Sequence, residues 1–109
     1  MVVNVCPAAV TSAAPDRAWR VLTTPERFRE WNDATFVRTE PPGPVAPGQL
    51  IHFTTRALGR TWPVTIEVRD MDPYSRWIDL LVHLPFGVYN HEHVTLTETK
   101  EGGTLVRFN

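Results

Sequence analysis

Hydrophobic and polar residues alternate with a period of two along most of the chain after residue 34, a pattern typical of β-strands that bury one face. The alternation predicts six strands, over residues 34–40, 50–57, 62–68, 77–84, 88–99 and 104–109. An earlier strand is predicted over residues 2–10, where β-branched and small side chains are frequent. Short segments rich in Gly and Pro separate most of these runs, so neighbouring strands should pair antiparallel.

Two short helices are predicted between the first strand and the second. Pro15 fits the first turn of the first helix, where its missing N–H costs nothing. The apolar face of this helix comprises Ala18, Trp19, Val21 and Leu22. Thr24 is placed to cap the second helix, in which Pro25 takes the first position. Phe28 and Trp31 lie three residues apart, on one side of it.

The order of elements, one strand, two short helices and six further strands, predicts an α+β fold with an antiparallel sheet. Such a sheet must bury one face, and two short helices cannot cover all of it. The proline-rich segment 41–48 is interpreted as a stiff loop between two strands, because proline cannot pair inside a sheet. A polyproline recognition motif is the alternative interpretation.

The composition fits one folded domain. The chain has 109 residues, of which 42% are hydrophobic and 21% charged. This length is enough for one domain over residues 1–109 and too short for two, and the composition excludes a disordered chain. Lys and Arg number 11 against 12 Asp and Glu, and the formal net charge of −1 supplies no field for nucleic acid and no basic surface for anionic lipid.

The N-terminal region and the cysteine content predict where the protein resides. Cys6 is the only cysteine, so the chain can form no internal disulfide and no thiolate metal cluster, which fits a reducing compartment. The first residues lack the basic stretch of a secretory signal, and no run reaches the roughly 18 apolar residues needed to span a bilayer. The sequence therefore predicts a cytoplasmic protein with no nucleic-acid partner and no stable membrane insertion.

The predicted strand over residues 88–99 carries two polar side chains on its apolar row. If Val94 and Leu96 point into the core, Glu92 shares their face, and so does Asn90, because side chains two residues apart lie on the same side of a strand. A carboxylate on an apolar face implies a polar patch, in which Glu92 would act as a general base with a raised pKa or anchor a ligand's hydroxyl or amine. In the alternative interpretation both side chains lie at the open end of the strand and are solvated.

The four histidines are expected to face water. His91 and His93 share one face of their strand and, with Glu98, partly match the metal-binding segment of cupins. Glu98, however, falls on the opposite face of that strand. His52 and His83 also oppose the apolar rows of their strands. No metal and no cofactor are therefore predicted, and the sequence contains no glycine-rich phosphate loop, CxxC pair or Gly-x-Ser-x-Gly motif.

Several segments together resemble one protein family. Residues 14–23 and 24–32 resemble its two opening helices, residues 47–49 its loop into the third strand, and residues 84–96 and 102–106 its late hairpins. The chain is thereby similar to the helix-grip superfamily called SRPBCC, which includes START lipid-transfer domains, the birch-pollen-allergen group and the polyketide cyclase/dehydrase group. The resemblance implies a curved antiparallel sheet of about seven strands, two short helices between strands 1 and 2, and an internal cavity.

Members of this family continue after the last strand into a long C-terminal helix that the curved sheet grips. This sequence stops at Asn109, so a C-terminally truncated domain without that helix is expected. A sheet without its gripped helix would expose a large apolar surface. Homo-oligomerisation through this open face is the expected consequence.

The resemblance implies that the protein binds a small hydrophobic or lipid-like molecule in the cavity between the sheet and the helices. The expected apolar lining comprises Ile51, Phe53, Trp62, Val64, Ile66, Ile78, Leu80, Val82 and Phe108. Asn90 and Glu92 would supply the polar handle. One alternative is a polyketide cyclase or dehydratase-like enzyme with Glu92 as the candidate catalytic residue, and another is an interaction domain that oligomerises through its open apolar face.

Overall fold

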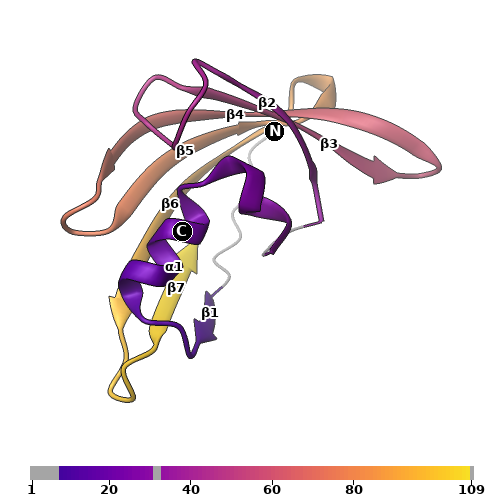
Figure 1. The fold of residues 1–109 in the computed structure, drawn as a ribbon. Coiled ribbons are helices and arrows are strands. Elements are labelled where there is room, and N and C mark those ends of the chain that lie inside the picture. The colour runs from indigo at the N-terminus through magenta and orange to yellow at the C-terminus, as the bar shows by residue number, and fades with distance from the viewer. Residues whose placement is uncertain (1–7, 31–32, 109) are drawn as a thin grey trace.

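Seven antiparallel strands form one curved sheet in the computed structural model, which describes residues 8–30 and 33–108 (Figure 1). The elements are β1 (Ala8–Thr11), α1 (Pro15–Leu22), the 3-10 helix η1 (Pro25–Glu30), β2 (Thr35–Glu40), β3 (Leu50–Ala57), β4 (Arg60–Asp72), β5 (Trp77–His83), the 3-10 helix η2 (Pro85–Gly87), β6 (Tyr89–Glu98) and β7 (Thr104–Phe108). The order across the sheet is β1-β7-β6-β5-β4-β3-β2. The predicted α+β fold is confirmed, while residues 2–7 of the predicted first strand, Cys6 included, lie outside the described residues.

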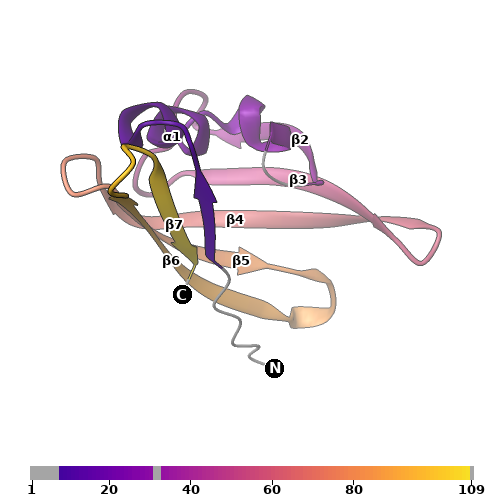
Figure 2. The same ribbon diagram turned by 90° about the horizontal axis from the view of Figure 1, so that it is seen from below.

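The sheet curves around α1 and η1, which pack on its concave side (Figure 2). The first helix begins at Pro15 and the second at Pro25, as predicted, but the second is a 3-10 helix, and the Thr24 hydroxyl does not form the predicted cap. The Thr24 hydroxyl instead donates to the carbonyl oxygen of Arg20 at 2.7 Å, because the last carbonyls of an α-helix lack partners within it. Trp31, expected on the second helix, lies outside the described residues.

The register between strands confirms the predicted alternation. Val64 of β4 lies opposite Phe53 of β3, and both side chains are buried. A β-bulge between Val68 and Asp70, which the alternation does not reveal, adds one residue to β4 and returns Met71 to the inner face. The buried core comprises Ala18, Leu22, Phe28, Val45, Ile51, Phe53, Val64, Ile66, Val68, Ile78, Leu80, Val94, Leu96 and Val106.

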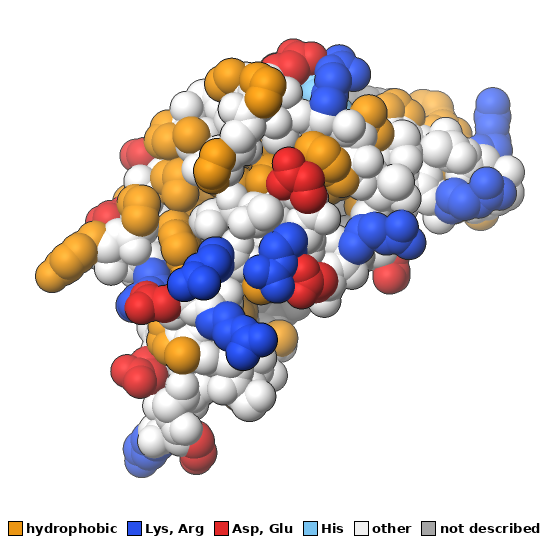
Figure 3. Space-filling view, viewed as in Figure 1, with side chains coloured by type: hydrophobic (Ala, Val, Ile, Leu, Met, Phe, Trp, Pro, Cys, Tyr) orange, Lys and Arg blue, Asp and Glu red, His pale blue; other side chains and the backbone are white. Residues whose placement is uncertain are grey.

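The proline-rich segment between β2 and β3 is a loop, as predicted. Together with α1 and η1, it covers the inner face of the sheet. Hydrophobic side chains gather over this part of the molecule in the space-filling view (Figure 3). Val45 is buried in the core, and its N–H donates to the carbonyl oxygen of Thr23 at 2.9 Å. The amide of Gln49, which is 1% exposed, donates to the carbonyl oxygens of Pro41 at 2.9 Å and Gly43 at 3.1 Å. One buried side chain therefore holds both ends of the loop's first turn.

Replacing Gln49 with methionine should lower the free energy of unfolding by about 1–3 kcal/mol. The substitution keeps the length of the side chain but removes its amide N–H groups. The carbonyl oxygens of Pro41 and Gly43 then lose their hydrogen bonds to residue 49. Urea unfolding followed by circular dichroism measures the loss. Ala46→Ser, at an exposed position of the same loop, is the control and should change the stability by less than about 0.5 kcal/mol. Equal midpoints for Gln49→Met and the native chain would contradict this role.

β7 pairs with the edge strand β1, and a groove lies between these two strands and α1. β7 ends at Phe108, and no helix follows it in the described part of the chain. None of the helices within residues 8–30 and 33–108 is long and apolar enough to cross a membrane.

Candidate functional site

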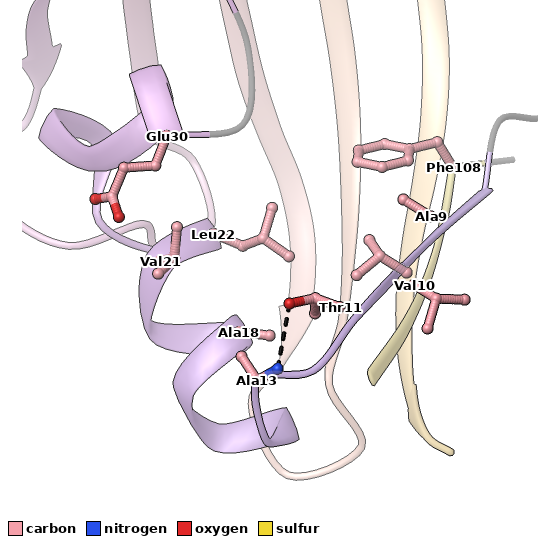
Figure 4. A pocket seen from close by; sticks show the side chains of 10 residues that line it. Ala9, Val10, Thr11, Ala13, Ala18, Val21, Leu22, Glu30 and Phe108 are labelled. Atoms are coloured by element: carbon pink, nitrogen blue, oxygen red, sulfur yellow. Dashed lines mark hydrogen bonds between the residues drawn. The ribbon is translucent and has the colours of Figure 1, made fainter. Parts of the chain in front are cut away.

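An apolar groove of about 350 Å³ lies between α1, β1 and β7 (Figure 4). It is lined by Ala9, Val10, Thr11, Ala13, Ala18, Val21, Leu22, Glu30, Val106 and Phe108. Val21 and Leu22 form the side that belongs to α1, and Phe108 lies across the groove from them. The volume is near the lower limit of the range of about 300–1,000 Å³ in which proteins bind small organic molecules.

Small side chains and one buried threonine set the width of the groove. Thr104 of β7 is fully buried, and its hydroxyl donates to the carbonyl oxygen of Ala13 at 2.8 Å. The N–H of Ala13 donates to the Thr11 hydroxyl at 3.2 Å. These bonds fix the turn between β1 and α1, and therefore the separation of the two walls. Ala9 and Ala18 contribute only methyl groups to these walls, which leaves the space between them open.

Glu30 is the charged member of the ten described residues that line the groove. Arg27 donates to both of its carboxylate oxygens, from Nε at 2.6 Å and from Nη2 at 3.0 Å. The Arg27 hydrogen bond holds the pKa of Glu30 below its ordinary value of 4.5, so the carboxylate is ionised at neutral pH. Because both side chains are exposed, water screens the pair, and it marks the rim of the groove without adding much stability.

Six of the predicted ligand-binding residues are buried in the packed core and do not border this groove. They are Ile51, Phe53, Val64, Ile66, Ile78 and Leu80. Phe53 stacks on Phe28 of η1, with the ring centroids 5.2 Å apart and the rings inclined by 12°. The space between η1 and the strands beneath it is only about 10 Å³, so the helices and the proline-rich loop fill this side of the cavity. Among the predicted apolar residues, Phe108 is the one that borders the groove.

The structure places Asn90 and Glu92 on the inner face of β6, as the alternation predicts. Glu92 lies directly opposite the buried Leu80 of β5, and Asn90 lies opposite Val82. The Asn90 side-chain amide donates to Oε1 of Glu92 at 2.9 Å. Partial burial raises the pKa of Glu92 above 4.5, and the Asn90 hydrogen bond opposes this shift.

Glu92 of β6 does not line the groove, but it lies close to the end of the groove that Phe108 forms. Phe108, at the end of the groove, pairs with Val94 of β6. Val94 and Glu92 are two residues apart on the same face, a spacing of about 7 Å along a strand. A molecule that fills the groove and extends past Phe108 would therefore meet the Glu92 carboxyl group.

The structure places Trp62 and Val82 away from the groove. Trp62 shares the inner row of β4, but it pairs with Thr55 near the turn of the β3–β4 hairpin and does not line the groove. Its ring centroid is 5.2 Å from that of Phe86, and its indole N–H donates to the carbonyl oxygen of Ala57 at 2.9 Å. Val82 is half-buried on β5, opposite Ile66.

The four histidines lie on the outer face of the sheet, each near a carboxylate. His91 Nε2 is 2.7 Å from Asp79 Oδ1, and His93 Nδ1 is 3.6 Å from the same atom. His52 is 3.5 Å from Glu40, and His83 is 3.7 Å from Glu67. Glu98 falls on the other face of β6, as the alternation predicts. In the described ranges, no group of three or more His, Cys, Asp or Glu side chains is arranged to hold a metal ion.

Sequence reasoning misses the walls that β1 and α1 contribute to the groove. The pattern identifies Ala18, Val21 and Leu22 as the apolar face of a helix and therefore favours the core as their location. In the structure, pairing of β1 with β7 brings Ala9 opposite Val106, across nearly the whole length of the chain. The local pattern does not encode this long-range pairing, and the apolar face of α1 is the one signal that points to the groove.

Replacing Glu92 with glutamine should make the protein modestly more stable at neutral pH. Because burial raises the Glu92 pKa in the folded state, its stabilising contribution is fully present below the unfolded pKa and is lost as the pH rises through the folded pKa. Glutamine stays neutral, so the variant should gain stability over the native chain at neutral pH and lose that advantage below pH 4.5. Urea unfolding at both pH values tests this, and a difference that does not change with pH would contradict it.

Comparison with known proteins gives one family and several similar folds. The family profile described as "Polyketide cyclase / dehydrase and lipid transport" matches residues 8–109. No curated protein matches the chain with comparable significance. A crystal structure of a protein from Rhodobacter sphaeroides has a TM-score of 0.69 at 20% identity, over 94% of this chain and 69% of that one.

Two further solved structures have the same fold. DynU16, a protein in the dynemicin biosynthetic locus, has a TM-score of 0.69 at 20% identity, over 96% of this chain and 36% of its own. Ara h 8.0201 has a TM-score of 0.64 at 14% identity, over 96% of this chain and 76% of its own. At these identities the structural likeness establishes the shared helix-grip type of fold.

Proposed function

The chain belongs to the polyketide cyclase / dehydrase and lipid transport family, and from this membership we propose that it binds a small hydrophobic molecule in the groove between α1, β1 and β7. The observation that carries the proposal is the groove itself. Its volume of about 350 Å³ suits a compact ligand, and nine of its ten lining residues are uncharged. Burial of an apolar ligand against these side chains is favourable because it removes apolar surface from water.

Asn90 and Glu92 are the proposed polar handle for this ligand. They lie next to the Phe108 end of the groove, and Glu92 is half-buried with a raised pKa. The carboxyl group would hydrogen-bond a hydroxyl or amine of a ligand whose apolar part fills the groove. In this proposal Phe108 contacts the ligand directly. The six buried core residues listed above, which include Ile51 and Leu80, support the groove without touching the ligand.

Displacement of the fluorescent probe 1-anilinonaphthalene-8-sulfonate tests the proposal. Decanoate, cholesterol and a flat polycyclic phenol are titrated against the probe bound to the full chain. The size of the groove predicts that decanoate or the flat phenol displaces the probe and that the larger sterol does so less well. A chain that binds neither the probe nor any of the three competitors would contradict the proposed function.

An enzyme is the second candidate, favoured by the raised pKa of Glu92 and its contact with Asn90. The site would hold a reactive polyketone in a folded shape while Glu92 accepts a proton from carbon and returns it to the departing hydroxyl group as water forms. Glu92→Gln should then abolish turnover and keep the affinity. Equal turnover in this variant would exclude the enzymatic role and leave the binding role intact.

Self-association is the third candidate, favoured by apolar surface beside the groove. Val10 of β1 is 72% exposed at the edge of the sheet, and Phe108 is half-buried. A second copy that covers this surface would give a mass above that of one chain in light scattering. If the ligands named above dissociate the oligomer, the second copy and the ligand compete for the groove. An oligomer that the ligands leave unchanged would have its interface elsewhere.

A further inference from the structure

Two hairpin turns present large hydrophobic side chains to solvent at one end of the sheet. Leu58, in the turn between β3 and β4, is 94% exposed, and Phe86, in η2, is 87% exposed. Trp62 joins the two turns, since its ring centroid lies 5.2 Å from that of Phe86. Both turns lie at the same end of the sheet in two perpendicular views (Figures 1 and 2). We call Leu58, Trp62 and Phe86, with Arg56 and Arg60 beside them, the hairpin tip.

The backbone makes the two exposed residues unusual. Leu58 has a φ of 54° and Phe86 a φ of 64°, in the left-handed region that favours glycine and asparagine. A bulky apolar side chain at such a position carries a conformational cost as well as the cost of exposure to water. Residues that are unfavourable in both respects concentrate at surfaces with a function. The presence of two such residues at one end of the molecule therefore indicates that a binding partner covers this surface.

The hairpin tip also carries positive charge. The Arg60 guanidinium lies over the Trp62 ring, 5.3 Å from its centroid. Arg56 is exposed on β3, and neither arginine has an ion-pair partner among the described residues. Basic side chains gather at this end of the molecule over the β3–β4 hairpin (Figure 3). A surface with the complementary negative charge is therefore the fitting partner.

We propose that the hairpin tip docks on an anionic lipid surface. Leu58 and Phe86 would enter the boundary between headgroups and acyl chains, while Arg56 and Arg60 pair with lipid phosphates. Trp62 adds an aromatic ring between the two turns, a side chain enriched at membrane interfaces, and its N–H is already paired with the carbonyl oxygen of Ala57. Two protruding turns fit a deformable lipid surface better than a protein partner, which would need a broad complementary surface. The docking is reversible, since two turns insert far less apolar surface than a spanning helix.

Co-sedimentation of the full chain with vesicles tests the proposal. One set of vesicles contains phosphatidylcholine alone, and the other contains about one-third phosphatidylserine. The native chain should sediment with the anionic vesicles, and the binding should weaken as salt screens the arginines. No sedimentation with either set would overturn the proposal and leave a protein partner as the explanation of the exposed residues.

Two variants and one control separate docking from folding. The double variant Leu58→Asn, Phe86→Asn should keep the fold, because asparagine accepts the left-handed conformation, and should bind anionic vesicles at least about tenfold more weakly. Arg56→Gln with Arg60→Gln should remove the preference for phosphatidylserine. Tyr74→Asn is the matched control, because Tyr74 is 93% exposed in the β4–β5 turn, away from the hairpin tip, and the variant should bind like the native chain. Undiminished binding by the first double variant, or an equal loss in the control, would overturn the proposal.

Discussion

Gly103→Val should lower the free energy of unfolding by about 3 kcal/mol or more, because the added side chain would clash with the backbone of β1. A Cβ atom at Gly103 would lie 2.3 Å from the backbone carbonyl oxygen of Thr11 and 3.3 Å from the Cα of Ser12. Both contacts are to backbone, so no side chain can rotate away to relieve them. The backbone itself is held by the pairing of Thr11 with Thr104.

The control for this substitution is the neighbouring glycine. Gly102 has a φ of 82°, and a Cβ there would meet nothing within 4 Å. Gly102→Asn therefore changes the turn residue without a clash and should cost about 1 kcal/mol or less. Urea unfolding of the two variants separates the loss of stability caused by the clash with β1 from the loss caused by the turn conformation. Equal losses for the two would show that the approach of β1 to residue 103 is not the cause.

The close approach at Gly103 also bears on the groove. It lets β1 lie against the start of β7, where the Thr104 hydroxyl holds the Ala13 carbonyl group. The same short segment connects to α1, so the position of the helix wall depends on it. A chain that tolerates a larger residue at Gly103 by moving β1 should therefore also change its affinity for the probe in the groove.

Local alternation predicts which face of the sheet each side chain occupies. The inner position of Glu92 follows from its spacing to Val94 alone, and the structure confirms it through the pairing with Leu80. The same rule correctly assigns Trp62 to the inner row of β4. It does not say which part of that face the helices cover, because that depends on the length of α1 and on the path of the proline-rich loop.

The local sequence pattern does not predict features that depend on how distant parts of the chain come together. The bulge between Val68 and Asp70 shifts the faces of β4 without any local glycine or proline to signal it. The groove depends on sheet curvature and on the pairing of Ala9 with Val106, which are 97 residues apart in the numbering. The net charge of −1 is likewise a sum over the whole chain, and it does not reveal that Arg56 and Arg60 both lie close to the turn of the β3–β4 hairpin.

Val21→Trp should weaken binding in the groove at least about tenfold, which corresponds to about 1.4 kcal/mol. Val21 is half-buried on α1 and faces the groove, so a larger side chain there extends into the ligand space instead of the packed core. An indole ring would occupy much of the volume of about 350 Å³ and would exclude a ligand of similar size. This effect rests on the proposed binding function and is measured by titration of the fluorescent probe and of decanoate.

Arg17→Trp is the control that identifies the groove as the site. Arg17 is exposed on the same helix and does not line the groove, so this variant adds an equal apolar ring to the surface of α1 without filling the cavity. It should bind the probe like the native chain, and both variants should unfold at similar urea concentrations. If Val21→Trp folds normally and binds with native affinity, the ligand does not occupy the groove between α1, β1 and β7, whereas loss of binding in both variants would show that the affinity resides on the outer surface of the helix.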